Sequence, residues 1–243
     1  MMPVIILVET QLPENLGAVA RVMANFGMTE LRLVRPQFDS VHPKAMATAV
    51  GAVNLIHQAK VTQTFEDAIT DINYLFGTSS SQRDIIKAYE TPKTFSEFLG
   101  SLNQEEGGIG IVFGPERTGL TNDYIARCQR MIQVPVNPAF SSLNLAQAVA
   151  IISYEIYQQK TLAFNKQSYH LHMGQTQKAS QQEIRKFLNF LEQSLDQTHY
   201  WRVDSKKPIM WRNLQNIFTR MDMTAQDIKT LYGMIRSLNR SSP

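Results

Sequence analysis

The amino-acid sequence predicts an α/β domain, with a largely parallel sheet covered by helices on both faces, followed by a small helical domain. Short apolar runs of strand length alternate with longer segments of helical periodicity through the first two-thirds of the chain. A polar stretch without periodicity then follows, and after it all signals are helical. These observations divide the chain into a first domain at residues 1–164, a linker at 165–178 and a helical domain at 179–243.

The expected strands are apolar runs bounded by turn residues. They are Val4–Glu9, Leu31–Val34, Tyr74–Gly77, Ile109–Gly114 and Met131–Pro135. Ligands of open α/β sheets bind at the carboxyl ends of the strands. The residues that directly follow these runs are therefore the first candidates for a functional site.

Two helices of the first domain are well specified. Leu16–Phe26 follows Asn15, a good N-cap residue, and precedes Gly27, which suits a helix end. A second, long helix is expected after Ser142, because apolar residues there recur at spacings of four, three and four. These residues are Leu145, Val149, Ile152 and Ile156.

The last part of the chain predicts three helices. Ser180 with Glu183 and Thr224 with Asp227 have the spacing of a capping box, and Pro208 suits a first helical turn. The apolar residues expected to form a small core are Trp201, Trp211, Phe187, Leu188, Leu191, Phe218, Leu231 and Ile235.

Charge is distributed unevenly along the chain. Residues 1–164 carry 12 basic and 15 acidic side chains, whereas residues 165–243 carry 12 basic and 6 acidic ones. A basic domain of this kind suits a polyanion such as RNA, because neutralised phosphates release counterions. A solvated helical face would have the same composition, and charge alone does not separate the two interpretations.

Composition narrows the class of protein. Cys128 is the only cysteine, which excludes an internal disulfide and a cysteine-cluster metal site. His170 and His172 lack further ligands, so no metal is expected. The apolar run Val4–Val8 is too short for a membrane span and no basic residue precedes it. We therefore expect no signal peptide, no membrane contact and a cytoplasmic location.

Three stretches mix small, amide and charged residues next to expected strands. They are "NLGAVAR" from Asn15, "FGPERTGL" from Phe113 and "PVNPAFSSLNLAQ" from Pro135. Their glycines do not fit the dinucleotide-binding or phosphate-loop patterns, and Ser142 does not lie in a hydrolase elbow. Turn chemistry explains each stretch alone. Their joint occurrence at strand ends instead indicates one composite site.

In order and content these stretches resemble the SpoU (TrmH-like) family of RNA ribose 2′-O-methyltransferases, of the SPOUT superfamily. The segments "LVETQLPENLGAVARVMANFGMTELRLVRP", "FGTSS", "VFGPERTGLTND" and "NPAFSSLNLAQAV" look most like its TrmJ branch, which methylates a ribose in the tRNA anticodon loop. The resemblance covers about residues 4–160, and the tail only by architecture. Pro115 stands where a charged residue is also common in that branch.

The resemblance implies a parallel sheet with a deep trefoil knot near its C-terminal part, S-adenosylmethionine as cofactor, and a homodimer in which the neighbouring chain completes the site. A glycine at 114 lets a cofactor approach the backbone, and the serine-rich turns offer hydroxyl and backbone partners. The implied cofactor contacts are Thr78, Ser79, Ser80, Gly114, Val134, Ser141, Ser142 and Leu143.

The implied reaction transfers a methyl group to a ribose 2′-hydroxyl. Arg21 is the first catalytic candidate, because its planar guanidinium suits both a phosphate and a developing alkoxide. Arginine stays protonated in proteins, so we assign Arg21 electrostatic stabilisation and not proton removal. Glu116 is expected to orient Arg21, of its own chain or of the partner subunit.

Each of the remaining candidate site residues has two possible roles. Asn15 hydrogen-bonds Arg21 or substrate, caps its helix, or does both. Arg117 contacts RNA phosphate or satisfies Glu116. Ser142 and Asn144 lie where a long helix begins and are expected to bind cofactor or substrate oxygen, although Ser142 also suits an N-cap.

These assignments predict an S-adenosylmethionine-dependent tRNA (cytidine/uridine-2′-O-)-methyltransferase that acts on nucleotide 32 of the anticodon loop. Methylation of ribosomal RNA or of another tRNA position, and an RNA-binding module without catalysis, are the alternatives. The expected RNA contacts are Arg21, Arg117, Lys178, Arg185, Lys186, Arg202, Lys206, Lys207 and Arg212.

Overall fold

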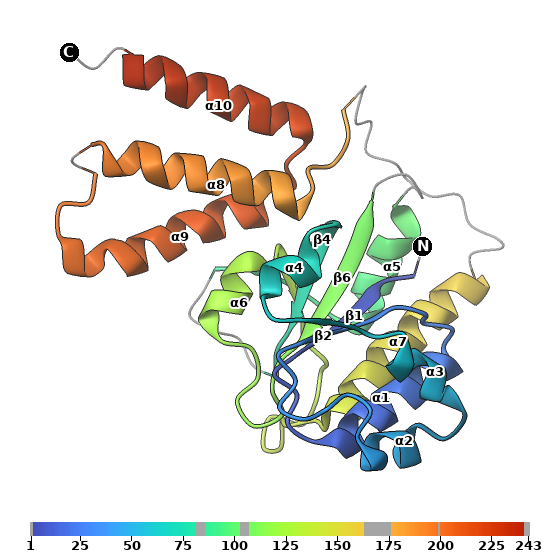
Figure 1. Ribbon diagram of the computed structural model, residues 1–243. Coiled ribbons are helices and arrows are strands. Elements are labelled where there is room, and N and C mark those ends of the chain that lie inside the picture. The colour runs from blue at the N-terminus through green and yellow to red at the C-terminus, as the bar shows by residue number, and fades with distance from the viewer. Residues whose placement is uncertain (1, 81–85, 103–106, 163–175, 199, 241–243) are drawn as a thin grey trace.

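The computed structural model describes residues 2–80, 86–102, 107–162, 176–198 and 200–240. Within these residues seven strands form one sheet in the order β3-β2-β1-β6-β4-β7-β5, and every pairing is parallel (Figure 1). The strands are β1 (Val4–Val8), β2 (Leu31–Val34), β3 (Lys60–Thr62), β4 (Ile72–Thr78), β5 (Ala88–Glu90), β6 (Gly108–Phe113) and β7 (Arg130–Ile132).

The five predicted strands are confirmed; Leu31–Val34 has the predicted ends, and the ends of the others differ by at most three residues. The sequence analysis missed β3 and β5, which occupy the two edges of the sheet. Each edge strand has three residues and is largely exposed or half-buried, so neither forms an apolar run. An edge strand needs no apolar face on both sides, which removes the signal that identifies a central parallel strand.

Helices cover both faces of the sheet, as alternation along β1 shows. Ile5 and Leu7 pack with α1 (Pro13–Asn25), α2 (Pro43–Ala49), α3 (Val53–His57), α5 (Pro92–Ser101) and α7 (Leu145–Leu162). Val4, Ile6 and Val8 pack on the other face with α4 (Phe65–Ile69) and α6 (Asn122–Arg127). A short 3-10 turn, η1 (Val50–Ala52), joins α2 to α3.

Helix packing explains Gly17, a glycine in the first of the three sequence stretches. A Cβ atom on Gly17 would lie 1.9 Å from Thr48 Oγ1 and 2.1 Å from the Ala45 carbonyl oxygen. Only glycine allows α1 and α2 to approach this closely. This contact fixes α1, and with it the first of the three sequence stretches.

Two predicted helix caps are wrong. Helix α1 begins at Pro13, two residues before Asn15, so Asn15 lies inside the helix and does not cap it. Helix α7 begins at Leu145, and the Oδ1 atom of Asn144 accepts a hydrogen bond of 2.9 Å from the Ala146 N–H. Asn144, and not Ser142, therefore caps α7. The predicted apolar stripe of α7 is buried, as expected.

The tail forms α8 (Gln181–Asp196), a short 3-10 turn η3 (Asp204–Lys206), α9 (Lys207–Arg220) and α10 (Ala225–Arg240), a layer of helices beside the sheet (Figure 1). Both predicted capping boxes are present. Most of the predicted core residues pack together around Phe187. Trp201 is half-buried at the margin, where its ring contacts Tyr200 and Trp211.

Buried polar contacts join the tail to the sheet. The Lys87 Nζ atom donates to the carbonyl oxygens of Ala126 and Cys128 and, at 2.9 Å, to Thr219 Oγ1 of α9. The side chain of Asp222 pairs with Arg130 at the start of β7 and with Lys178. The tail is therefore held on the sheet by specific hydrogen bonds and ion pairs.

Candidate active site

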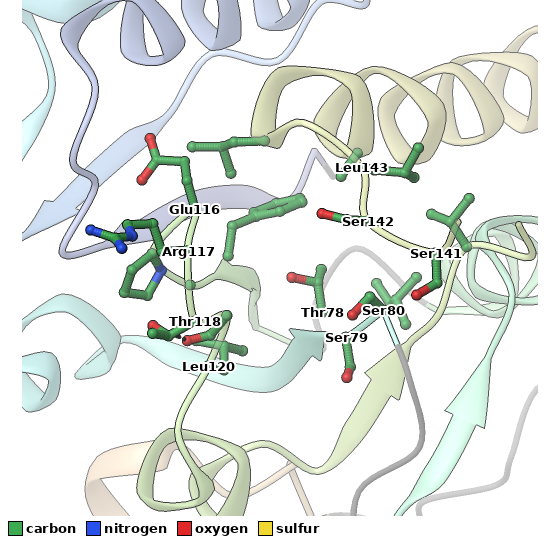
Figure 2. Close-up of a pocket in the computed structure, with 18 of the residues that line it drawn as sticks. Thr78, Ser79, Ser80, Glu116, Arg117, Thr118, Leu120, Ser141, Ser142 and Leu143 are labelled. Atoms are coloured by element: carbon green, nitrogen blue, oxygen red, sulfur yellow. Dashed lines mark hydrogen bonds between the residues drawn. The ribbon is translucent and has the colours of Figure 1, made fainter. Parts of the chain in front are cut away.

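A hollow of about 200 Å³ lies at the carboxyl ends of β4, β6 and β7, against the first turns of α7 (Figure 2). This is the edge at which ligands of open α/β sheets bind. All eight residues expected to contact a cofactor line this hollow: Thr78, Ser79, Ser80, Gly114, Val134, Ser141, Ser142 and Leu143. The structure thus brings three distant segments together, whereas their contact with a cofactor stays a prediction.

Backbone groups position the turn after β4. The Ser79 N–H donates to the Ile132 carbonyl oxygen at 3.1 Å, and the Thr78 hydroxyl donates to the Val112 carbonyl oxygen at 3.0 Å. The Thr78 hydroxyl hydrogen is thus already used within the sheet. This side chain can offer a ligand only its remaining acceptor capacity.

The loop from Gly114 to Leu120 folds back on itself beside the hollow. A Cβ atom on Gly114 would lie 2.3 Å from the Leu120 backbone nitrogen, and Gly119 adopts a φ of 64°. Both glycines are therefore required by the loop itself. Closure of this loop is a role for Gly114 that the sequence analysis missed, in addition to the expected approach of a cofactor.

The Glu116 carboxylate holds the N-terminus of α1. It accepts hydrogen bonds from the N–H of Gln11 at 2.9 Å, the N–H of Leu12 at 3.3 Å and the hydroxyl of Thr10 at 3.0 Å. Asn15 Nδ2 donates to the same carboxylate at 2.8 Å. Burial opposes ionisation of Glu116, but these hydrogen bonds prevail and lower its pKa. An acidic residue in this turn thus caps a helix from about 100 positions away.

Side chains from all three stretches form one hydrogen-bonded chain. Asn15 donates to Glu116, and its Oδ1 atom accepts from Asn144 Nδ2 at 2.9 Å. Asn144 in turn caps α7, the helix whose first turns border the hollow. Three predicted catalytic residues are therefore joined, and a shift of any one would move the other two.

The two arginines of the predicted site lie differently. Arg117 is exposed and lines the hollow, and within the described residues it makes no ion pair with Glu116. Arg21 is exposed on the outer face of α1 and does not line the hollow of its own chain. The expected contact between Glu116 and Arg21 is not formed within one chain, because Thr10, Gln11 and Asn15 occupy the carboxylate.

The basic residues of the tail are not equivalent. The predicted RNA contact of Lys178 is wrong, because this side chain is 1% exposed, with its Nζ atom 2.6 Å from Asp222 and over the Tyr74 ring. Lys207 and Arg212 form ion pairs with Asp196 and Asp123. Of the predicted RNA contacts in the tail, Lys186, Arg202 and Lys206 are exposed and form no ion pair among the described residues, and Arg185 is half-buried.

The described part of the chain offers no group of three histidine, cysteine or acidic side chains arranged for a metal ion. His170 and His172 lie outside the described residues. Cys128 is buried, and burial raises the pKa of its thiol to about 12. No described helix is long and apolar enough to cross a bilayer.

The sequence analysis also missed residues that shape the site. Thr10 and Gln11 hold Glu116, and their only signal is that they directly follow a predicted strand. Ile152 lines the apolar side of the hollow. Ile152 is one of the apolar positions predicted along α7, and from the sequence it is expected to be a core residue. One side chain thus serves both core and site.

A parallel sheet with a hollow among the turns at its carboxyl edge is typical of α/β proteins that bind a small molecule at this edge. The chain belongs to the SpoU rRNA Methylase family, whose profile matches residues 2–154. It is therefore an RNA methyltransferase, as the resemblance implied.

Relatives extend the match over nearly the whole chain. The tRNA (cytidine/uridine-2′-O-)-methyltransferase TrmJ of Pectobacterium atrosepticum is 33% identical over 245 residues, which cover 98% of this chain and 96% of that protein. The crystal structure of TrmJ from Z. mobilis ZM4 superposes with a TM-score of 0.84 at 37% identity, and covers 98% of this chain and 99% of its own. The helical tail is thus shared with these relatives.

The fold also matches a methyltransferase solved with its cofactor. The SpoU methyltransferase AviRb from Streptomyces viridochromogenes, in complex with AdoMet, has a TM-score of 0.52 at 21% identity over 66% of this chain and 61% of that chain. At this identity the match shows a shared fold, and S-adenosylmethionine as the methyl donor of this chain stays a prediction.

Proposed function

We propose that this chain is an S-adenosylmethionine-dependent tRNA (cytidine/uridine-2′-O-)-methyltransferase that acts on nucleotide 32 of the anticodon loop. The observation that carries the proposal is the hydrogen-bonded chain Asn144–Asn15–Glu116, which unites all three sequence stretches beside one hollow. The near full-length similarity to TrmJ proteins supports tRNA as the substrate.

The hollow suits the methyl donor chemically. Turns at residues 78–80 and 141–143 offer backbone N–H and C=O groups and serine hydroxyls for an adenosine and an amino-acid group. Leu145 and Ile152 supply an apolar wall for the remainder. S-adenosylmethionine supplies an electrophilic methyl group on a sulfonium sulfur.

Arg21 would act on the ribose from a neighbouring chain. Its exposed position on α1 leaves the hollow of its own chain without this guanidinium. From a second chain it would hold the phosphate beside the acceptor ribose and stabilise negative charge on the 2′ oxygen. Arg117, at the mouth of the hollow, would hold a further phosphate.

A homodimer provides the neighbouring chain. Ile151, Tyr154 and Tyr157 are partly exposed on α7. The Phe26 ring at the end of α1 packs edge-on against Tyr154 and at a tilt against Tyr157, with its centroid 6.0 Å from each. An apolar surface that spans α1 and α7 is suited to a second copy of this chain. We also propose the trefoil knot, a cytoplasmic location, and an RNA-binding role for residues 179–243.

Ribosomal RNA is the second candidate substrate, since the family profile carries that description. Transfer of radiolabelled methyl to purified tRNA and to ribosomal RNA, followed by mass spectrometry of the digested product, separates the two. We expect a 2′-O-methylated cytidine or uridine at tRNA nucleotide 32. A label found only in ribosomal RNA, or at another tRNA nucleotide, would exclude the proposed substrate. An absence of transfer would favour a non-catalytic RNA-binding module.

A further inference from the structure

A second hollow, of about 370 Å³, lies beside the candidate active site. The loop after Gly114 borders the first hollow with residues 115–120 and leads into the second at Thr121. The residues that line the second hollow are Glu9, Arg35, Phe65, Glu66, Thr121, Asp123, Tyr124 and Arg127. None of the assignments above gives this hollow a role.

Two of its residues have unusual backbone conformations. Glu9 has a φ of 50° and Arg35 a φ of 45°, in the left-handed region that favours glycine. They directly follow β1 and β2, and their N–H groups donate to the carbonyl oxygens of Val34 and Thr62. Strained residues of this kind gather at binding sites, where the surrounding structure enforces the conformation.

The side chains of these two residues form a fixed polar pair. Arg35 Nη2 donates to Glu9 Oε1 and to the Tyr124 hydroxyl, which itself donates to Glu9 Oε1 at 3.1 Å. The Tyr124 ring packs edge-on against Phe65 at 5.0 Å. Arg35 Nε and Nη1 and Glu9 Oε2 have no hydrogen-bond partner among the described residues. Both side chains stay partly exposed, at 47% and 32%.

Charge around the hollow argues against a phosphate as the main ligand. Three carboxylates, of Glu9, Glu66 and Asp123, face the guanidinium groups of Arg35 and Arg127. Arg127 is already paired with Glu66 at 2.7 Å. Arg35 is paired with Glu9, and Arg212 of α9 with Asp123, so each guanidinium group is balanced by a carboxylate and the hollow offers a dianion no excess positive charge. Adjacent donors and acceptors beside an aromatic ring instead suit a neutral planar group with a hydrogen-bonding edge. Single-stranded RNA presents such groups as its unstacked bases.

The hollow is also coupled to the candidate catalytic network and to the tail. Thr10, which follows Glu9, donates to Glu116 at 3.0 Å. Arg212 of α9 pairs with Asp123 on its rim at 2.8 Å. The second hollow thus lies between the network at the first hollow and the helical tail, the two parts assigned to the RNA substrate. The tail helices lie beside α6, which carries Tyr124 (Figure 1).

We propose that the second hollow binds one unstacked nucleobase of the RNA strand that carries the acceptor ribose, with Glu9 and Arg35 contacting its hydrogen-bonding edge. A carboxylate acceptor next to guanidinium donors matches both pyrimidines, each of which presents a donor beside an acceptor. This inference rests on the proposed function, since it specifies how that substrate is held.

The test compares Arg35→Met and Glu9→Gln with wild type in full-length protein. We expect each variant to raise the KM for RNA about 10-fold or more, the loss typical of one base contact, with unchanged affinity for S-adenosylmethionine by calorimetry. Lys44→Met is the matched control, because it also removes an exposed cation paired with a glutamate, Glu14, on another surface. Thermal unfolding verifies that all variants are folded.

Synthetic RNAs with a single abasic nucleotide then identify the base. For wild type, one loop position should reproduce the loss caused by Arg35→Met, and combining that RNA with the variant should cause no further loss. Additive losses at every position, or a KM of Arg35→Met equal to that of Lys44→Met, would overturn the inference.

A control separates this inference from the substrate assignment. Wild-type transfer to tRNA and to ribosomal RNA is measured first, and the abasic set is made in the RNA that is methylated. Failure of the tRNA assignment is thereby distinguished from failure of the second hollow, and absence of any RNA binding would overturn both.

Discussion

Glu116 shows how one side chain can connect two parts of a composite site. Its carboxylate accepts two backbone N–H groups at the start of α1 and the side chains of Thr10 and Asn15. A carboxylate at this position also interacts favourably with the helix dipole. The orientation of α1, and of the exposed Arg21 that it carries, therefore depends on a residue in the loop after β6.

Glu116→Gln should lower the free energy of unfolding by about 1 kcal/mol at pH 7, the usual cost of a lost charged cap. The pKa of Glu116 is lowered from its ordinary value of 4.5, so its stabilisation is present above that value and is lost as pH falls through the lowered pKa. Urea unfolding of the wild-type protein and of Glu116→Gln between pH 3 and pH 7 measures this difference in stability. A stability difference that persists unchanged at the acid end would contradict this account.

Arg21→Ala should leave cofactor affinity intact and reduce methyl transfer by about two orders of magnitude or more, as is typical when one oriented charge donor is removed. The physical reason is loss of the guanidinium from the acceptor ribose. Calorimetry with S-adenosylmethionine and single-turnover transfer to tRNA separate the two effects. Near-wild-type transfer would remove Arg21 from the proposed mechanism.

Sequence reasoning located the residues of the first hollow because strand ends in a parallel sheet share an edge, whatever their separation in sequence. It placed the caps wrongly, since the groups that cap α1 come from Glu116 and not from the neighbouring Asn15. Local spacing contains no record of such a distant partner. The same limit hides the burial of Lys178, whose charge is neutralised by Asp222 from the turn before α10.

At the scale of elements, α9 is fixed to the sheet by the buried Lys87. The pKa of Lys87 is lowered to about 8, mainly by burial; Cys128 acts in the opposite direction, and the nearby Arg220 adds to the lowering. Its Nζ atom still has three oxygen acceptors, including Thr219 of α9. Docking of the tail therefore uses a cation whose charge is disfavoured by its surroundings.

This predicts a rise in stability at alkaline pH that Lys87→Met should lack. Between pH 8 and the ordinary lysine pKa of 10.5, the unfolded chain holds a proton that the folded chain has released, so the free energy of unfolding rises with pH. Urea unfolding of both proteins across this interval gives the difference directly. Parallel curves would show that Lys87 keeps its ordinary pKa in the folded protein.

The exposed cations of the tail are expected to affect the salt dependence of tRNA binding. A triple variant, Lys186→Ala with Arg202→Ala and Lys206→Ala, should bind tRNA more weakly and with a salt dependence reduced by about one unit of slope for each lost phosphate contact. Lys207 pairs with Asp196, so Lys207→Ala serves as a comparison with less effect on the slope. An unchanged slope in the triple variant would place the tRNA on another surface.

At the scale of the whole molecule, the exposed position of Arg21 determines how many chains make one active site. The hollow and the Asn144–Asn15–Glu116 network are complete within a chain, whereas Arg21 lies on the outer face of α1. The apolar surface over α1 and α7 lies on the same pair of packed helices. A dimer through this surface would therefore join two incomplete sites into two complete ones.

Mixed dimers test this arrangement. Arg21→Ala retains its hollow, whereas Gly114→Ala loses it, because the new Cβ atom would lie 2.3 Å from the Leu120 nitrogen. Each variant alone should be inactive.

After exchange of subunits, about half of the dimers contain one copy of each variant. Each of these mixed dimers has one intact hollow, and its partner subunit supplies an intact Arg21, so about a quarter of wild-type transfer should return. If Arg21 instead served its own hollow, no mixed dimer would contain a complete site and mixing would restore nothing. Thermal unfolding and sedimentation of both variants establish that they fold and form dimers, so recovery depends only on which chain supplies the arginine.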